Sequence, residues 1–178
     1  MVDKFIFLSY QRSRTTTPAM EQLYRRAGVV LAADGVETFF DRRSLEAGDA
    51  WLPSIDAFLA KCTHFLAFVS IDYWLSAQCR RELDIAVSRY ELTGAPQLLF
   101  VLADSLAPGD LLLNPPGADA VEPLRRRVRS LGQINFLGPH DEAGRLVRLA
   151  FESPHLLADQ LAELVEALQR PWRETRVR

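Results

Sequence analysis

Cysteine and lysine are both scarce in this chain of 178 residues. The two cysteines, Cys62 and Cys79, form no Cys-x-x-Cys pair, and no histidine lies at the spacing of zinc ligands, so we predict neither a metal site nor a disulfide framework. Both fall on apolar helical faces, and we interpret Cys79 as a packing residue and not as a nucleophile. Only Lys4 and Lys61 of the 21 basic residues are lysine, a bias typical of GC-rich genomes that favours a bacterial source.

Long apolar runs are missing as well. No stretch approaches the roughly 20 apolar residues of a membrane span, and the run at 5–10 is too short for a signal peptide. The net charge of −2 gives no general attraction to nucleic acid or anionic lipid. We therefore expect a cytoplasmic protein with neither nucleic acid nor membrane as a partner.

Short apolar runs and helical patterns alternate along the chain. This alternation predicts a parallel sheet with helices on both faces, and right-handed crossovers favour a flavodoxin-like, doubly wound sheet of five strands. Two helical segments close the chain, the second beginning at Ser153-Pro154. We expect one domain over 1–170 and a tail or the start of a linker at 171–178. The predicted strands cover 5–10, 36–40, 64–70, 97–104 and 133–138, and the main helical patterns before the close lie at 17–35, 55–62, 76–90 and 121–132.

Polar residues follow several of these strands. In doubly wound sheets, ligands bind in the crevice at the carboxyl ends of the strands, so chemistry is expected at that edge. The polar strand ends are Ser9-Tyr10, Asp41, Ser70 and Asp104.

The stretch SAQCRREL begins a predicted helix with Ser76 as its N-cap. Leu75 belongs to the apolar stripe of this helix, and Glu82, two turns on, projects within about 20° of it, at the margin of the buried face. Arg80 and Arg81 then point to solvent. Glu82 is partly desolvated, and two interpretations stay open: a catalytic acid, or a boundary acid bonded to a backbone or side-chain donor.

Three motifs in chain order resemble a TIR (Toll/interleukin-1 receptor) domain over about residues 4–170. The segment FLSY with the following Gln-Arg resembles the first TIR box, and DRRSLEAGDAW is similar to the loop after the second strand. The pattern Ser-x-x-Cys-x-x-Glu-Leu resembles the helix motif that carries the catalytic glutamate of TIR enzymes, which assigns that role to Glu82. Some members of the family are adaptors that signal by assembly, and others cleave NAD+ between nicotinamide and ribose.

The resemblance implies an NAD+ nucleosidase that gives nicotinamide and ADP-ribose or a cyclic form, and that is activated by self-assembly in immune signalling such as antiphage defence. The alternative is a non-catalytic module that assembles with other TIR domains. NAD+ would be a substrate and not a cofactor, since the nine glycines include no G-x-G pair and so no dinucleotide-binding fingerprint. Implied partners are further copies of the chain and a fused sensor domain.

A single carboxylate suffices for this reaction. Glycosidases use a second carboxyl group to protonate the leaving oxygen, but nicotinamide leaves NAD+ as a neutral molecule and needs no acid. Positive charge builds on the ribose, where a fixed carboxylate in a low-dielectric crevice can stabilise it.

Further site residues are predicted around Glu82 and at the strand ends. Many TIR enzymes carry a tryptophan one turn before the glutamate; that position is Gln78 here, and Trp74, a further turn back, either substitutes for it or belongs to the core. Arg12 contacts a phosphate or is solvated, and Asp41 contacts the substrate or caps its own loop. The predicted substrate contacts are Ser9, Tyr10, Arg12, Asp41, Ser70, Trp74 and Gln78.

The loop after the second predicted strand and an arginine cluster are two further features of the sequence. In TIR domains the loop after the second strand contacts a neighbouring subunit, which implies an assembly role for Leu45, Gly48 and Trp51; Trp51 alternatively anchors the helix that follows the loop. The arginines between 125 and 129 lack interleaved aromatic residues, so we interpret them as a solvated helix face and not as a nucleic-acid site.

Overall fold

The computed structural model describes residues 4–11, 22, 37–40, 51–103, 118–131 and 135–169. Within these ranges, the side chains of 37–40, 51–54, 118–120 and 169 are not described. The predictions made at Arg12, Asp41, Leu45, Gly48 and Asp104 lie outside the described residues. So do the tail and, apart from Gln22, the first predicted helix.

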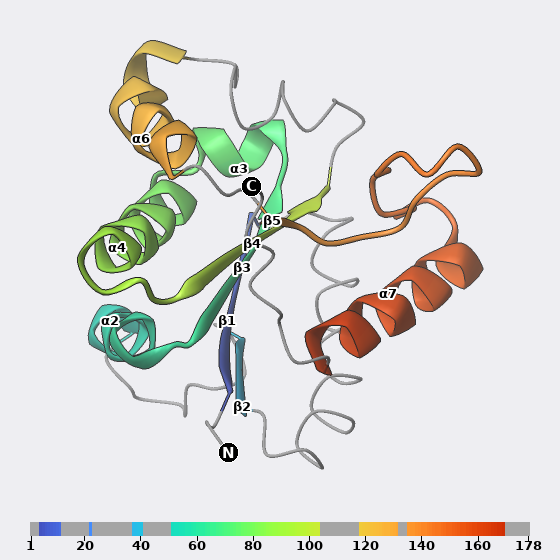
Figure 1. Cartoon of the computed structure of the whole chain (residues 1–178), viewed down its shortest axis with the longest axis horizontal. Coiled ribbons are helices and arrows are strands. Elements are labelled where there is room, and N and C mark those ends of the chain that lie inside the picture. The colour runs from blue at the N-terminus through green and yellow to red at the C-terminus, as the bar shows by residue number, and fades with distance from the viewer. Residues whose placement is uncertain are drawn as a thin grey trace.

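The described strands form one parallel sheet in the order β2-β1-β3-β4-β5 (Figure 1). Four of them have four to six residues, whereas β5 has only two and pairs with β4 through Leu99 and Phe100. The parallel α/β sheet predicted from the alternating pattern is confirmed, although its fifth strand is much shorter than expected. The strands are β1 Phe5–Tyr10, β2 Glu37–Phe40, β3 His64–Val69, β4 Gln97–Leu102 and β5 Asn135–Phe136.

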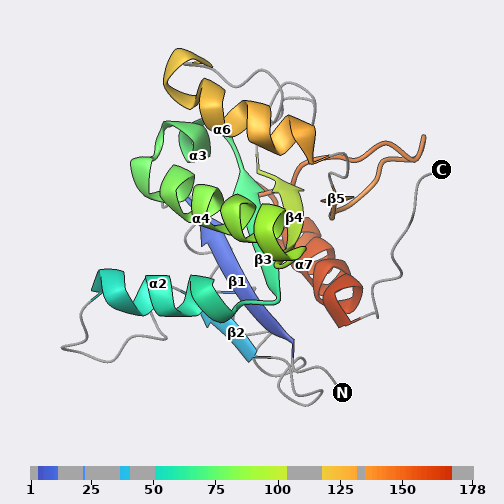
Figure 2. The same cartoon turned by 60° about the vertical axis from the view of Figure 1, so that its left-hand side comes forward.

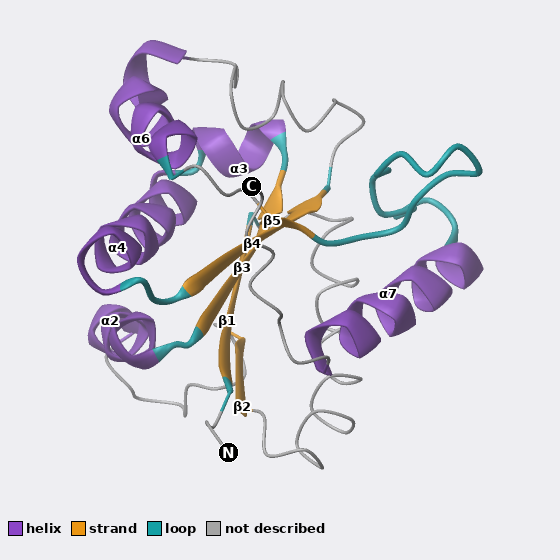
Figure 3. Cartoon of the chain, in the orientation of Figure 1, coloured by secondary structure: helices purple, strands orange, loops and turns teal. Residues whose placement is uncertain are grey.

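Helices cover both faces of the sheet. Three longer helices, α2, α4 and α6, lie on one face together with the short α3, and α7 lies on the other (Figures 1 and 3). On the first face, α4 runs between α2 and α6 (Figure 2). None of the helices in the described ranges has both the length and the apolar character that a bilayer crossing requires. The helices are α2 Trp51–Lys61, α3 Ile71–Leu75, α4 Ala77–Thr93, α6 Ala118–Ser130 and α7 Pro154–Gln169.

The interior strand β1 is apolar almost throughout because both of its faces are buried. Successive side chains of a strand point to opposite faces, and both faces are covered here. Phe5 and Phe7 pack in the core under α2, α4 and α6, while Ile6, Leu8 and Tyr10 pack in the core under α7. Each large apolar side chain buried in this way contributes about 1.5–3 kcal/mol. Ser9 falls on the α4 face, where it is also buried.

The helix break at Ser76 corrects one prediction. The Ser76 N–H donates to the carbonyls of Asp72 (3.0 Å) and Tyr73 (3.2 Å) and so closes α3, while its hydroxyl accepts from the Cys79 N–H (3.3 Å) and caps α4. Ser76 is therefore the N-cap of α4, as predicted. The helical period does not continue back to Leu75, whose side chain lies in the other helix and is 57% exposed.

Only one of the two helical segments predicted to close the chain forms. That segment is α7, which begins at Pro154 as expected. Before it, the Asp141 carboxylate accepts from the backbone N–H groups of Ala143 and Arg145, both at 2.9 Å, and an isolated bridge joins His140 to Leu146. These local bonds satisfy the backbone in a turn, so no helix is needed there.

Candidate active site

Glu82 is the one buried charged residue among those described, with 5% of its surface exposed. Helical spacing explains its burial. Glu82 lies on the same side of α4 as Cys79, Leu83 and Ala86, which pack in the core between the helix and the sheet. Glu82 is thus more deeply buried than a residue at the margin of the apolar face. A buried carboxylate is costly unless donors satisfy its oxygens.

Each oxygen of Glu82 has a donor from the chain. The Ser9 hydroxyl donates to Oε2 at 2.6 Å, and the Gln78 side-chain amide donates to Oε1 at 3.0 Å. A distance of 2.6 Å is typical of a hydroxyl bonded to an ionised carboxylate, which is a charge-assisted and therefore stronger bond. The two donors come from different elements, β1 and α4, so together they fix the plane of the carboxylate.

Tyr73 of α3 extends this network to a third element. Its hydroxyl lies 3.0 Å from the Ser9 oxygen, and its side chain is fully buried. Ser9 has one hydroxyl hydrogen, which it gives to Glu82, so Tyr73 must be the donor to Ser9. Burial raises the pKa of Tyr73 well above its usual value, and the nearby Cys79 and Glu82 raise it further. Tyr73 therefore stays protonated and remains a donor.

The start of α3 explains why Tyr73 points inward. The Ser70 hydroxyl accepts from the Tyr73 N–H at 3.0 Å and so caps the helix that begins just after β3. Ser70 was predicted as a substrate contact at a strand end, and here its oxygen serves the helix cap.

The structure brings together three of the predicted site residues, Ser9, Gln78 and Glu82, and separates others from them. Tyr10 lies on the opposite face of the sheet, in the core under α7. Trp74 is 0% exposed and packs edge-on against Tyr73, with ring centroids 6.3 Å apart. Of the two roles considered for Trp74, the structure favours the core residue, because no face of its ring is open to a base.

Two residues near the site were not predicted from the sequence. Tyr73 gave no signal beyond its place in the first turn of a helix after a strand end. Gln11, the first residue after β1, is the acceptor of a 3.8 Å contact from the Cys79 thiol. Gln11 belongs to the FLSYQR segment, so the motif carried a signal that could have identified it.

Arg80 and Arg81 were expected to point to solvent, but both make contacts within the fold. Arg81 Nη2 lies 2.7 Å from both carboxylate oxygens of Asp56 in α2. Arg80 Nη1 donates to the Trp74 carbonyl at 2.6 Å. These bonds attach α4 to α2 and to α3. Across the residues that the structure describes, no three His, Cys, Asp or Glu side chains cluster as metal ligands would.

Comparisons with known proteins agree with the fold. The family model for the TIR domain matches residues 6–146, a range that includes Ser9, Tyr73 and Glu82. The TIR domains of the activated Roq1 resistosome, which directly recognises the pathogen effector XopQ, are 20% identical, with a TM-score of 0.55 over 70% of this chain and 80% of that one. The TIR domain of the Toll-related receptor TRR-2 from Hydra magnipapillata is 16% identical, with a TM-score of 0.44 over 72% and 98%. No curated protein matches the sequence significantly.

Proposed function

Because the chain belongs to the TIR domain family, we propose that it is an NAD+ nucleosidase that breaks the bond between nicotinamide and ribose. One observation carries the proposal: the Glu82 carboxylate is buried beside the carboxyl end of β1 with a donor on each oxygen. This edge of a doubly wound sheet is where ligands bind. A carboxylate held there is suited to stabilise positive charge on a ribose.

The proposed reaction needs no general acid. The electron pair of the bond between ribose and nicotinamide passes to the ring nitrogen, which is cationic in NAD+ and becomes neutral as nicotinamide leaves. The ribose becomes an oxocarbenium ion, whose positive charge Glu82 stabilises from a low-dielectric position. Water then attacks and loses a proton to give ADP-ribose; attack by a nucleophile of the adenine moiety gives a cyclic product instead.

Gln78 occupies the side of Glu82 from which the ribose would approach. Gln78 is half-buried, whereas Ser9 and Tyr73 are buried. In this proposal the hydroxyl groups of the ribose replace the Gln78 amide at Oε1, while Ser9 keeps its bond to Oε2. The Gln78 side chain can turn toward solvent without loss, because water satisfies its amide there.

A second candidate is a non-catalytic module that signals by assembly, and the same carboxylate gives it support. Both Glu82 oxygens already have donors within the chain, and only 5% of the residue is exposed. Under this interpretation Glu82 joins α4 to β1 and has no chemical role. The Roq1 resistosome, with which the chain shares its fold, is itself an assembly that contains TIR domains.

Both candidate functions, the nucleosidase and the non-catalytic module, involve self-association of the chain. We infer that copies of the chain associate in the cytoplasm through the loop that carries Leu45, Gly48 and Trp51, and that a fused sensor domain triggers this association in an immune response such as antiphage defence. Trp51 begins α2, and its side chain lies outside those described. No resident cofactor is proposed, because NAD+ is the substrate.

The test is an assay of nicotinamide release from NAD+ by the purified protein at concentrations that favour association. An active enzyme releases nicotinamide together with ADP-ribose or a cyclic product, and chromatography identifies which. A folded, associated protein that releases no nicotinamide would rule out the nucleosidase and leave the assembly module.

A further inference from the structure

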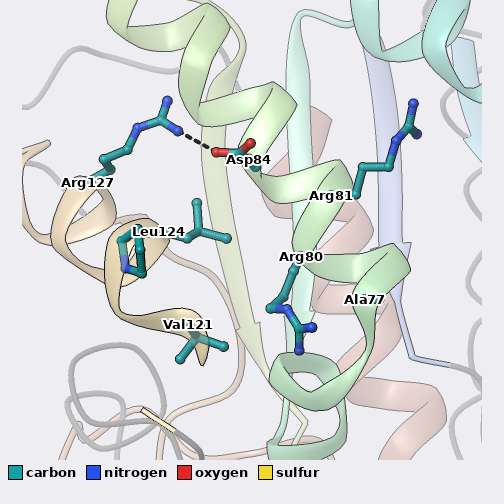
Figure 4. A pocket seen from close by; sticks show the side chains of 8 residues that line it. Ala77, Arg80, Arg81, Asp84, Val121, Leu124 and Arg127 are labelled. Atoms are coloured by element: carbon teal, nitrogen blue, oxygen red, sulfur yellow. Dashed lines mark hydrogen bonds and ion pairs between the residues drawn. The ribbon is translucent and has the colours of Figure 1, made fainter. Parts of the chain in front are cut away.

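A pocket of about 380 Å³ lies between α4 and α6, away from Glu82. We propose that this pocket is a second binding site, which takes a small molecule with a phosphate or carboxylate group next to an apolar part. Arg80 lies about 160° around α4 from Glu82, so the pocket and the candidate active site occupy opposite sides of one helix. The pocket is lined by Ala77, Arg80, Arg81, Asp84, Val121, Pro123, Leu124 and Arg127 (Figure 4).

The charges around the pocket are unevenly neutralised. Arg127 pairs with Asp84 and, at 2.7 Å, with Glu91, and Arg81 pairs with Asp56. Arg80 has no carboxylate partner among the residues that the structure describes, and its guanidinium makes one hydrogen bond there, to the Trp74 carbonyl. Arg80 is therefore the lining guanidinium that an anion could pair with, while the other two are already paired with carboxylates.

Donors as well as charge remain available. A guanidinium has five N–H donors, and Arg80 uses one nitrogen, Nη1, for the Trp74 carbonyl. Arg81 also lines the pocket, but its guanidinium points away from Leu124 and Arg127 (Figure 4) and is bonded to Asp56. Phosphate and carboxylate oxygens suit the remaining planar donors of Arg80. Because Arg80 is half-buried and already held by its bond to Trp74, less side-chain entropy is lost on binding.

The remaining lining indicates what the anion is attached to. Val121 and Leu124 pack in the core beneath the pocket, and Ala77 and Pro123 add apolar surface. Figure 4 shows Arg80 next to Ala77, the Arg127–Asp84 pair farther along, and Leu124 between them. A volume of 380 Å³ is near the lower end of the roughly 300–1,000 Å³ of ligand pockets. The ligand is therefore of the size of a mononucleotide or an aromatic acid.

The test is a titration of the ¹⁵N-labelled protein, followed by its amide spectrum. The probes are AMP for a phosphate ester, benzoate for a carboxylate, and adenosine as the uncharged control. We expect saturable shifts at Ala77 and Leu124 with one of the two anions, which identifies the group that is bound, and none with adenosine. No saturable shift with either anion would refute the site, as would shifts at Ser9 and Tyr73 with none at Leu124.

Substitutions of Arg80 test whether its guanidinium binds the anion. Arg80→Gln should weaken binding about tenfold or more, and Arg80→Lys should recover part of it because the charge returns. The matched control is Arg126→Gln on α6, whose side chain is 76% exposed, pairs with Glu122 and does not line the pocket. Equal affinity in Arg80→Gln and the wild type would contradict the proposal.

A variant that fills the pocket keeps the test decisive if Arg80→Gln does not fold. Ala77 is exposed at the first residue of α4, so Ala77→Trp adds bulk without removing a guanidinium. We expect Ala77→Trp to abolish binding of the anion with a melting curve close to that of the wild type. Unchanged binding in folded Ala77→Trp would overturn the assignment of the pocket.

Discussion

The hydroxyl of Ser9 lies 2.6 Å from Oε2 of Glu82, although the two residues are 73 positions apart in the chain. This bond joins the carboxyl end of the interior strand β1 to the first turns of α4. Tyr73 donates to the same hydroxyl, so three elements meet at one oxygen atom. The two candidate functions make different predictions for this network.

Glu82→Gln should lower NAD+ cleavage by at least about 10²–10³-fold, because the neutral amide cannot stabilise an oxocarbenium ion. The fold should persist, since the amide oxygen can still accept from Ser9. Nicotinamide release measures the rate, and circular dichroism checks the fold. The matched control is Glu166→Gln on the exposed side of α7, which should retain full activity. Wild-type turnover in Glu82→Gln would exclude the catalytic role.

Ser9→Ala tests whether Ser9 positions the carboxylate. The substitution leaves the buried Tyr73 hydroxyl without its acceptor, which should cost about 1–3 kcal/mol of unfolding free energy. We expect kcat to fall with little change in KM, because the carboxylate loses its orientation. In the double variant Ser9→Ala/Tyr73→Phe, stability should return in part, because no tyrosine hydroxyl is left unpaired although Oε2 of Glu82 still lacks its donor, while kcat stays low. Recovery of kcat together with stability would show that Ser9 acts only through the fold.

Self-association should control activity, in accordance with the role proposed for Gly48. Specific activity should fall on dilution, because dissociated chains would lose a part of the site that a neighbour supplies. Gly48→Pro should reshape the loop, prevent assembly and remove activity while the melting temperature stays near that of the wild type. Light scattering records the size of the particles beside the assay. Constant specific activity from monomeric particles would show that the active site is self-contained.

His64 should make the protein less stable in mild acid. Burial, together with the charge of Lys4, lowers the pKa of His64 from 6.5 to about 4. Between these values the unfolded chain binds a proton that the folded chain does not, so the free energy of unfolding falls as the pH drops from about 6.5 toward 4. The loss should be on the order of 2 kcal/mol, reduced because the imidazole is partly exposed.

Urea denaturation at pH 6.5 and pH 4.5 measures this effect. In His64→Gln the difference between the two pH values should be smaller, since the side chain no longer titrates. An equal difference in the variant and the wild type would assign the pH dependence to other groups.

The sequence predicted the scaffold of the site better than its contacts. Apolar runs identified the strands because both faces of the sheet are buried, and Ser76 was recognisable as a cap from its place before a helical pattern. The exposure of Leu75 was missed, since the bonds of the Ser76 N–H to Asp72 and Tyr73 end one helix where a single period had been assumed. Local periodicity carries no information on such a break.

The hydrogen-bond partners of Glu82 show more clearly what the sequence could not predict. Strand alternation implies that Ser9 and Tyr10 face opposite sides of the sheet, and applying it would have separated Tyr10 from the site. The link from Tyr73 through Ser9 to Glu82 could not be predicted, because it depends on how α3 and α4 pack over β1. Contacts of this kind arise from tertiary structure and leave no spacing pattern in the chain.

The attachment of Glu82 to β1 has a consequence for how the protein fails on heating. β1 is hydrogen-bonded to β2 on one side and to β3 on the other, and such central strands open only in global unfolding, whereas active-site loops open locally at much lower cost. The bond from Ser9 therefore keeps the carboxylate oriented until the sheet itself separates. Thermal inactivation of the proposed enzyme should follow the unfolding curve and not precede it.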